Sequence, residues 1–328
     1  MIHDSIMSCV GATPIVALRR LFPDDGAQVF AKLEFLNPGG SIKDRPARYI
    51  IGQGLASGAI TPESVLVEST SGNLGVALAM MAKTHSLRFI AVVDPNITPA
   101  NLAIIGHLGA QIEMVTKRDP SGGYLETRLE RVQQLLQEDP CAVWINQYAN
   151  RLNQESHFFG TGEEIVSALD APVDCLVNAV STGGTIMGTA QRLRQAFPEL
   201  RVVAVDAIGS AIFGGPSSPR SLPGIGSSRR PGLLDVAGID RVVYVSEEES
   251  IQACRELLRE EAILAGASSG SVIAGIQKLI PILPRPTRIV TVLPDRGERY
   301  LDSVYDAPLN NDLVAADIDA QLLPSALA

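Results

Sequence analysis

Residues 37–49 read NPGGSIKDRPARY and follow an apolar, β-branched run at residues 29–35 that predicts a strand. Two glycines form the turn after this strand, and the residues beyond Lys43 have the pattern of a helix start. Lys43 is therefore predicted to lie where a strand ends and a helix begins. A lysine at such a position, with few solvent contacts, can have a lowered pKa and act as an amine nucleophile. On these residues alone, a solvated lysine at a helix start is the other interpretation.

Strand and helix patterns alternate along the rest of the chain. Eight further strands are predicted, at residues 65–68, 87–93, 111–115, 142–145, 174–179, 202–206, 242–245 and 288–293. Apolar residues at helical period lie between them, for example at residues 74–83, 102–108 and 125–136. This alternation predicts an α/β fold built of βαβ units, with open parallel sheets covered by helices on both faces.

Two segments stand outside this alternation. Residues 214–231 are rich in Gly, Pro and Ser and predict a long loop that is functional or mobile. Residues 309–328 have no clear strand or helix period and predict a C-terminal tail.

Charge and composition limit the classes of function. The 328 residues carry a net charge of -9, so we expect no nucleic-acid partner and no affinity for acidic membranes. No signal peptide or membrane-spanning run is recognisable, and we expect a cytoplasmic protein. The cysteines lack metal-site spacing and lie beside apolar segments, which predicts no metal site and reduced core thiols at Cys9, Cys141, Cys175 and Cys254.

Three more polar turns lie between a predicted strand and a helix, where ligands bind in α/β proteins. ESTSGNLG at residues 68–75 suits a carboxylate or a ring oxygen, although an ordinary helix cap would need only one of its polar side chains. STGGT at residues 181–185 matches neither a Walker loop nor GxGxxG and suits a single phosphate monoester. GASSGS at residues 266–271 is joined by LPDRGERYL at residues 293–301. Together with one lysine, these turns describe a pyridoxal phosphate site.

The motifs resemble those of the fold type II pyridoxal phosphate enzymes, the cysteine synthase and cystathionine β-synthase family, over residues 11–305. GATP at Gly11, NPGGSIKDR, TSGNLG, STGGT, PGIG at Pro223, SSG at Ser268 and DRGERYL occur in the family's order and spacing. The resemblance implies two open, twisted, mainly parallel sheets in two domains, with pyridoxal 5'-phosphate between them. It implies a large cofactor-binding domain of residues 1–38 and 145–308, and a small mobile substrate-binding domain of residues 39–144. It also implies a homodimer that acts on small-molecule amino-acid substrates.

The resemblance further implies roles for individual residues. Lys43 would hold the cofactor as a Schiff base and transfer the α proton of the substrate. Asn73 would hydrogen-bond the ring hydroxyl oxygen, and Ser268 would face the pyridine nitrogen. The cofactor phosphate would be bound by Ser181, Thr182, Gly183, Gly184 and Thr185. The substrate carboxylate would be bound by Ser69, Thr70, Ser71 and Gln147.

Departures from the cysteine synthase pattern point to one branch of the family. Leu74 replaces a threonine, Ser181 replaces a glycine, and SLPGIGSSRRP replaces PHKIQGIG. These segments, with GGYLETR at residues 122–128, resemble the diaminopropionate branch, whose member in staphyloferrin B biosynthesis joins O-phospho-L-serine to the α-amine of L-glutamate. A leaving phosphate needs a cation and donors, for which we expect Arg128, Tyr148 and Ser181.

Other interpretations stay open at this point. Arg128 alone could be a solvated arginine on a helix, and the arginines of residues 214–231 could either meet the carboxylates of glutamate or be solvated. Cysteine synthesis from O-acetylserine or O-phosphoserine with sulfide is the alternative activity. A catalytically silent relative that acts as a binding or regulatory partner is the third hypothesis.

Overall fold

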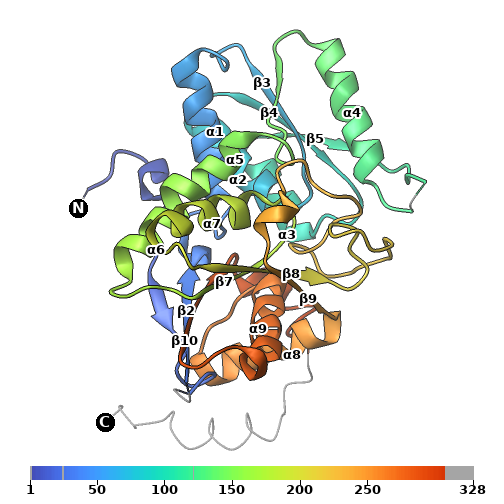
Figure 1. Ribbon diagram of the computed structural model, residues 1–328. Coiled ribbons are helices and arrows are strands. Elements are labelled where there is room, and N and C mark those ends of the chain that lie inside the picture. Colours follow the sequence, from blue (N-terminus) through green and yellow to red (C-terminus); the bar gives the residue numbers. More distant parts are fainter. Residues whose placement is uncertain (1, 24–25, 121, 307–328) are drawn as a thin grey trace, which may run out of the picture.

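The computed structural model describes residues 2–23, 26–120 and 122–306, which form two sheets flanked by helices (Figure 1). The larger sheet has six strands in the order β1-β2-β10-β7-β8-β9. Its first pair, β1 and β2, is antiparallel, and its other pairs are parallel. The strands are β1 (Ile15–Ala17), β2 (Ala27–Leu33), β7 (Cys175–Ala179), β8 (Arg201–Ala207), β9 (Arg241–Val245) and β10 (Thr287–Leu293).

The smaller sheet has four parallel strands in the order β5-β4-β3-β6. Every residue of β3 is buried, as expected for a central strand covered on both faces. The strands are β3 (Val65–Ser69), β4 (Arg88–Val93), β5 (Gln111–Met114) and β6 (Ala142–Trp144). The two sheets confirm the predicted α/β fold class with mainly parallel strands.

Successive residues of a strand point to opposite faces of the sheet. Apolar residues lie on both faces of each sheet here, and helices cover both faces. On β8, Val203 and Val205 pack with α8 (Glu247–Glu261) and α9 (Ala267–Leu279), whereas Val202 and Ala204 pack with α6 (Glu163–Ala168) and α7 (Gly184–Ala196). The smaller sheet is covered on one face by α1 (Asp44–Ser57), α2 (Asn73–Thr84) and α3 (Pro99–His107), and on the other by α4 (Leu125–Glu138).

Shorter helical segments connect these elements. The chain continues from α5 (Arg151–Ser156) through a π-helical turn, η3 (His157–Gly162), directly into α6. The 3-10 turns are η1 (Ile6–Cys9), η2 (Glu34–Leu36), η4 (Val236–Gly238), η5 (Ile280–Ile282) and η6 (Gly297–Tyr300).

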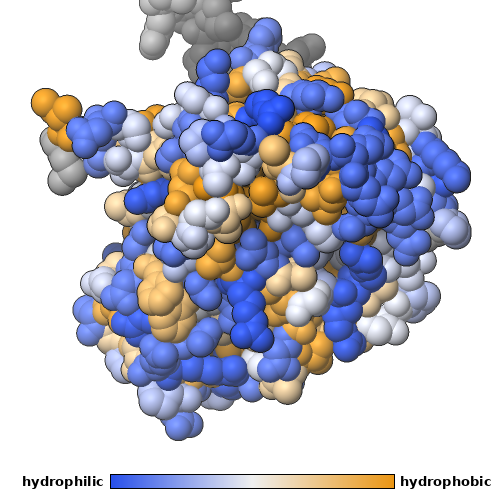
Figure 2. All heavy atoms as spheres, turned by 90° about the horizontal axis from the view of Figure 1, so that it is seen from above, coloured by the Kyte–Doolittle hydropathy of each residue, from blue (hydrophilic) through white to orange (hydrophobic). Residues whose placement is uncertain are grey.

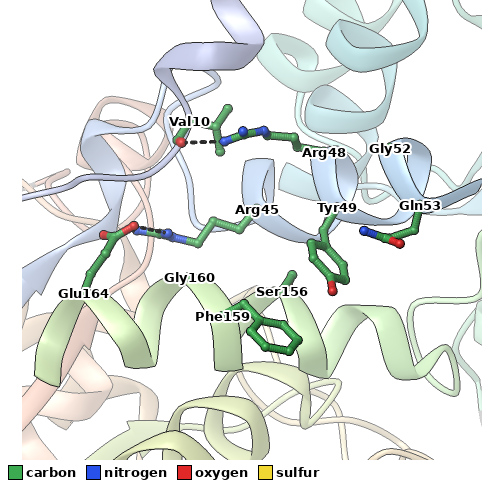
Figure 3. Close-up of a pocket in the computed structure, with 10 residues that line it drawn as sticks. All are labelled: Val10, Arg45, Arg48, Tyr49, Gly52, Gln53, Ser156, Phe159, Gly160 and Glu164. Carbon is green, nitrogen blue, oxygen red and sulfur yellow. Dashed lines mark hydrogen bonds and ion pairs between the residues drawn. The ribbon is translucent and has the colours of Figure 1, made fainter. Parts of the chain in front are cut away.

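A largely buried ion cluster joins β2, α1 and α6, and Figure 3 shows its Arg45–Glu164 pair. Arg45 Nε lies 2.6 Å from Glu34 Oε2, and Arg45 Nη1 lies 2.7 Å from Glu164 Oε1. Lys32 Nζ lies 2.7 Å from the other oxygen of Glu164. Two cations therefore face two anions, which limits the cost of burying the four charges. Arg45 and Glu164 also line a hollow of about 410 Å³, whose other lining residues include residues of α1, α5 and η3.

Hydrophilic side chains cover most of the face in Figure 2, and the hydrophobic ones form separate patches.

The exposure of the cysteines corrects one prediction. Cys175 and Cys254 are buried as expected, but Cys9 and Cys141 are exposed, so the prediction of core thiols is wrong for these two. Cys9 ends a 3-10 turn without buried residues, and Cys141 precedes β6, so neither lies in a packed element.

Three findings concern the remaining expectations. No helix among the described residues is long and apolar enough to cross a membrane. Within residues 2–23, 26–120 and 122–306, no group of three His, Cys, Asp or Glu side chains could hold a metal ion. The predicted tail at residues 309–328 lies outside the described residues.

Candidate active site

A cavity of about 280 Å³ lies at the carboxyl ends of β3, β4 and β6, where α4, the segment before α7 and η6 also meet. Strand ends of parallel sheets are the common position of ligand sites. Nine of the predicted site residues line it, namely Lys43, Ser69, Thr70, Ser71, Asn73, Arg128, Gln147, Tyr148 and Ser181. The fold therefore brings together residues that are far apart in the sequence.

A second space, of about 30 Å³, lies at the start of α7 and shares Lys43, Ser181 and Gly224 with the cavity. Its lining also includes three residues of the STGGT turn, Thr182, Gly183 and Thr185. The first N–H groups of a helix have no partner within the helix, so they are available to an anion here. A small space with backbone N–H groups and hydroxyls fits one phosphate group.

The glycines of this turn are required by close packing. Gly183 has φ +85°, and a Cβ on it would lie 3.2 Å from the backbone N of Leu234. Gly184 does not line the small space, and a Cβ on it would lie 2.4 Å from Asn153 Oδ1. Both positions therefore exclude larger residues and keep the start of α7 close to its neighbours.

Lys43 is the N-cap residue of α1, and it lines both spaces. The preceding residue, Ile42, donates its N–H to Pro294 O at 2.8 Å, which ties this turn to the end of β10. Burial lowers the pKa of the Lys43 amine, and the nearby Asp295 carboxylate partly opposes this shift. An amine with a lowered pKa is a better base and nucleophile near neutral pH.

The amide of Asn73 is held from two sides by the segment after β10. Its Nδ2 donates to Asp295 Oδ2 at 2.7 Å, and its Oδ1 accepts a hydrogen bond from Arg299. Tyr300 OH also donates to Asp295, and Arg299 donates to Gly39 O at 2.6 Å. Arg299 and Tyr300 line the cavity. The sequence predicted that DRGERYL lies near the site, but it did not predict that Asp295 and Arg299 hold the Asn73 amide.

Ser268 is the second residue of α9 and is 3% exposed. It lines neither space, but its Oγ lies 3.4 Å from the position of a Cβ on Gly224, which lines both. Gly224 has φ +90° and belongs to the PGIG turn. Ser268 is thus directly behind one wall of the site.

The turn after β3 is held by backbone contacts. Thr70 donates its N–H to Val92 O at 2.9 Å, and its Oγ1 accepts from Gly75 N at 3.0 Å. Gln147 Nε2 donates to Ser69 O at 3.2 Å. Ser69, Thr70, Ser71 and Gln147 therefore lie together, as the resemblance implied, with Ser69 and Thr70 buried.

Arg128 is not a solvated arginine, because its side chain is only 13% exposed. Its Nη1 donates to Ser71 Oγ at 3.0 Å, and its Nε lies 3.2 Å from Asp94 Oδ2. Tyr148 stands nearby, and burial raises the pKa of its hydroxyl whereas the charge of Arg128 opposes the shift. Asp94 was not predicted, although its place directly after β4 is a signal that could have found it.

The loop at residues 214–231 contributes to the site. Its Pro223 and Gly224 line the cavity. Arg220 donates to Gly209 O, and Arg230 Nε donates to Ile212 O at 3.0 Å. Arg229 is exposed and lies over the Tyr148 ring at 6.0 Å.

Comparison with known proteins identifies the family. Residues 6–295 match the model of the family described as pyridoxal-phosphate dependent enzyme. The chain belongs to this family. It is therefore a pyridoxal-phosphate-dependent enzyme, and the predicted cofactor is confirmed. The small space at α7, the adjoining lysine, the buried Ser268 side chain and the half-buried Asn73 side chain fit that cofactor.

Two similar relatives are named N-(2-amino-2-carboxyethyl)-L-glutamate synthase. The protein of Ralstonia nicotianae is 59% identical over 306 residues, 93% of this chain and 90% of the relative. That of Cupriavidus metallidurans is 56% identical over 309 residues, 93% of this chain and 91% of the relative.

Solved structures of fold type II enzymes superpose on most of the chain. O-ureido-L-serine synthase has a TM-score of 0.88 at 32% identity, covering 96% of this chain and 100% of that one. The O-acetylserine dependent cystathionine beta-synthase from Helicobacter pylori has a TM-score of 0.86 at 31% identity, covering 92% and 98%. The fold type II architecture is confirmed.

Proposed function

We propose that this enzyme joins O-phospho-L-serine to the amine of L-glutamate and releases phosphate, which is the N-(2-amino-2-carboxyethyl)-L-glutamate synthase reaction. The observation that carries the proposal is the 59% identity to a relative of that name over 93% of the chain. This similarity favours glutamate over sulfide as the nucleophile. The product would serve synthesis of L-2,3-diaminopropionate for a siderophore or a related natural product.

The cofactor-binding residues have the roles that the family resemblance gives them. Lys43 would hold the cofactor covalently and remove the Cα proton of the substrate, for which its lowered pKa is suited. Asn73 would hydrogen-bond the ring hydroxyl oxygen, and Ser268 would face the pyridine nitrogen. The STGGT turn would bind the cofactor phosphate. When bound, pyridoxal phosphate supplies the electron-withdrawing ring that stabilises negative charge at Cα.

The remaining lining residues bind the substrate. Ser69, Thr70, Ser71 and Gln147 hold its carboxylate with hydroxyls, an amide and backbone N–H groups. Arg128, Tyr148 and Ser181 bind the phosphate of O-phosphoserine, which carries about two negative charges near neutral pH. The planar guanidinium of Arg128 suits such a group because it can donate two parallel hydrogen bonds. In the overall reaction the bond from Cβ to the phosphate oxygen breaks and a bond from Cβ to the glutamate nitrogen forms.

The larger organisation is also part of the proposal. We assign residues 39–144 to the small domain, because they contain the four strands of the smaller sheet, and residues 1–38 and 145–308 to the large one, of which the structure describes residues 2–23, 26–38 and 145–306. Closure of the small domain on the substrate carboxylate would exclude water from the reacting centre. The family resemblance also implies that the enzyme is a homodimer, and we expect it in the cytoplasm.

Phosphate release from O-phosphoserine by the purified, cofactor-loaded protein tests the function. The reaction is run with glutamate, with sulfide and with neither, beside O-acetylserine as an alternative donor. We expect phosphate release that depends on glutamate, together with a conjugate of the expected mass. The Lys43→Ala variant should release no phosphate and form no conjugate. Turnover only of O-acetylserine with sulfide would instead identify a cysteine synthase.

A further inference from the structure

Asp94 is fixed in the wall of the cavity directly after β4. It is 4% exposed, and its Oδ2 accepts a hydrogen bond from Ser71 Oγ at 3.0 Å. Its own N–H donates to Ser71 Oγ at 3.2 Å, and its Oδ1 accepts from Asn96 N at 2.8 Å. The carboxylate therefore has one orientation, set by the turns after β3 and β4.

Arg128 completes a triangle with Asp94 and Ser71. Its Nη1 donates to Ser71 Oγ at 3.0 Å, and its Nε lies 3.2 Å from Asp94 Oδ2 without hydrogen-bond geometry. The attraction between Arg128 and Asp94 is therefore mainly electrostatic. Because a guanidinium is planar and rigid, contacts at its Nη1 and Nε atoms also set the direction of Nη2. Nη2 has no hydrogen-bond partner among the described residues.

An acidic residue in this wall needs a physical reason. Among the described residues that line the cavity, Asp94 alone has a carboxyl side chain, beside the cations Lys43, Arg128 and Arg299. A carboxylate close to a phosphate site weakens the attraction for the phosphate. That cost is offset if the carboxylate holds the arginine in the orientation that binds, because misplacement of a binding group by about 1 Å can lower the rate a hundredfold.

We propose that Asp94 is a positioning residue that orients Arg128 toward the leaving group and so selects a phosphate-bearing donor over an acetyl ester. The inference rests on the proposed function for its donor, O-phosphoserine. Ser71 belongs both to this triangle and to the turn assigned to the substrate carboxylate. An asparagine at position 94 keeps an oxygen that can accept the hydrogen bond from Ser71 Oγ, so Asp94→Asn leaves in place the turn assigned to the carboxylate of either donor.

The test compares Asp94→Asn with Glu113→Gln. Both variants remove one ion pair between α4 and its sheet, but the Glu113–Arg131 pair, at 2.9 Å, is on residues that do not line the cavity. We expect Asp94→Asn to lower kcat/KM for O-phosphoserine by about tenfold to a hundredfold and to change that for O-acetylserine by less than about threefold. Glu113→Gln should change neither. An equal loss with both donors in Asp94→Asn would overturn the inference.

A double-mutant cycle separates positioning from a general packing role. If Asp94 acts through Arg128, then adding Asp94→Asn to Arg128→Ala should cause no further loss with O-phosphoserine. A further loss as large as that of Asp94→Asn alone would contradict this.

Binding of inorganic phosphate, measured by calorimetry on the cofactor-loaded protein, gives a readout that does not depend on turnover. Weaker binding by Asp94→Asn than by Glu113→Gln is expected, and tighter binding would show that Asp94 only repels the anion. If the wild type releases no phosphate from O-phosphoserine, the proposed function fails, but this comparison still decides the role of Asp94.

Discussion

Glu68 lies beneath the substrate turn and is fully buried. Its Oε2 accepts a hydrogen bond from Gln147 N at 3.2 Å, and its Oε1 has no hydrogen-bond partner among the described residues. Burial raises the pKa of this carboxyl to about 7, although backbone donors and the charge of Arg128 oppose the shift. Near neutral pH the group is therefore close to half protonated inside the core.

This shift predicts a pH dependence of stability. The ordinary pKa of 4.5 applies to the unfolded chain, so the folded state holds the proton more tightly. The contribution of Glu68 to the free energy of unfolding is thus fully present below about pH 4.5 and is lost as the pH rises through about 7. Complete ionisation costs on the order of 3 kcal/mol.

Urea denaturation of wild type and Glu68→Gln at pH 5, 6, 7 and 8 measures this dependence. The free energy of unfolding should fall with pH more steeply in the wild type than in the variant. Asp44 and Asp206, whose pKa values burial raises to about 6, contribute equally to both proteins. Identical slopes for the two proteins would contradict the prediction.

At the residue scale, the sequence predicted the groups that belong to ordered motifs. Lys43 and the STGGT turn could be found because each follows a strand and precedes a helix within a few residues. Asp94, Asp295 and Arg299 act through partners such as Arg128 and Asn73, which lie far away in the sequence. One sequence contains no signal for such pairs, so their contacts appeared only in the fold.

At the element scale, the middle of α7 packs against its neighbours through a further glycine, Gly188. A Cβ on Gly188 would lie 2.1 Å from Gln154 O and 2.9 Å from His157 Cβ, so α7 contacts α5 and η3 at backbone distance. His157 Nε2 in turn lies 3.3 Å from Thr185 Oγ1, in the turn assigned to the cofactor phosphate. Close approach of these helices therefore supports the shape of that turn.

Gly188→Ala should destabilise the protein by about 1–3 kcal/mol, because backbone and side chain must move apart. Gly52→Ala is the matched control, since Gly52 is also in a helix and no atom lies within 4 Å of its Cβ position. That change should stabilise the protein by about 0.5–1 kcal/mol. Urea midpoints of the two variants should therefore move in opposite directions, and a shift of Gly188→Ala upward would be inconsistent with the contact.

Element prediction succeeded where hydrophobic patterns were long enough. All nine predicted strands are present, with ends that differ by at most two residues. The unpredicted strand, β1, has three half-buried residues at the edge of the sheet, so it carries no periodic signal. The π-helical turn between α5 and α6 was also missed, because its backbone geometry depends on the contacts with α7.

At the scale of the whole molecule, the ion cluster of Lys32, Glu34, Arg45 and Glu164 connects segments that no single sheet joins. Arg45 is at the start of α1, two residues after Lys43, and contacts Glu34 after β2 and Glu164 on α6. Side-chain exposure is 5% for Arg45 and 0% for Glu34. Removal of the arginine would leave a buried carboxylate poorly compensated.

Arg45→Met should lower the free energy of unfolding by about 3–5 kcal/mol, the usual cost of breaking a buried ion pair. Arg192→Met is the control, because it breaks an ion pair with Glu163 on the neighbouring part of α6, where Glu163 is 47% exposed. That change should cost no more than about 1 kcal/mol. Urea denaturation of both variants at one pH measures the two losses of unfolding free energy. Similar losses would mean that the buried cluster stabilises the protein no more than the exposed Arg192–Glu163 pair does.

The position of β10 also affects the order in which the molecule can form. β10, the last strand among the described residues, lies between β2 and β7, and its Thr287 pairs with Ala27, which comes far earlier in the sequence. During synthesis, the smaller sheet comes from one continuous stretch and can be completed early, whereas the middle of the larger sheet is missing until β10 leaves the ribosome. Until then β2 and β7 have unpaired edges, which are prone to wrong pairing. The growing chain therefore depends longest on protection from aggregation around β2 and β7.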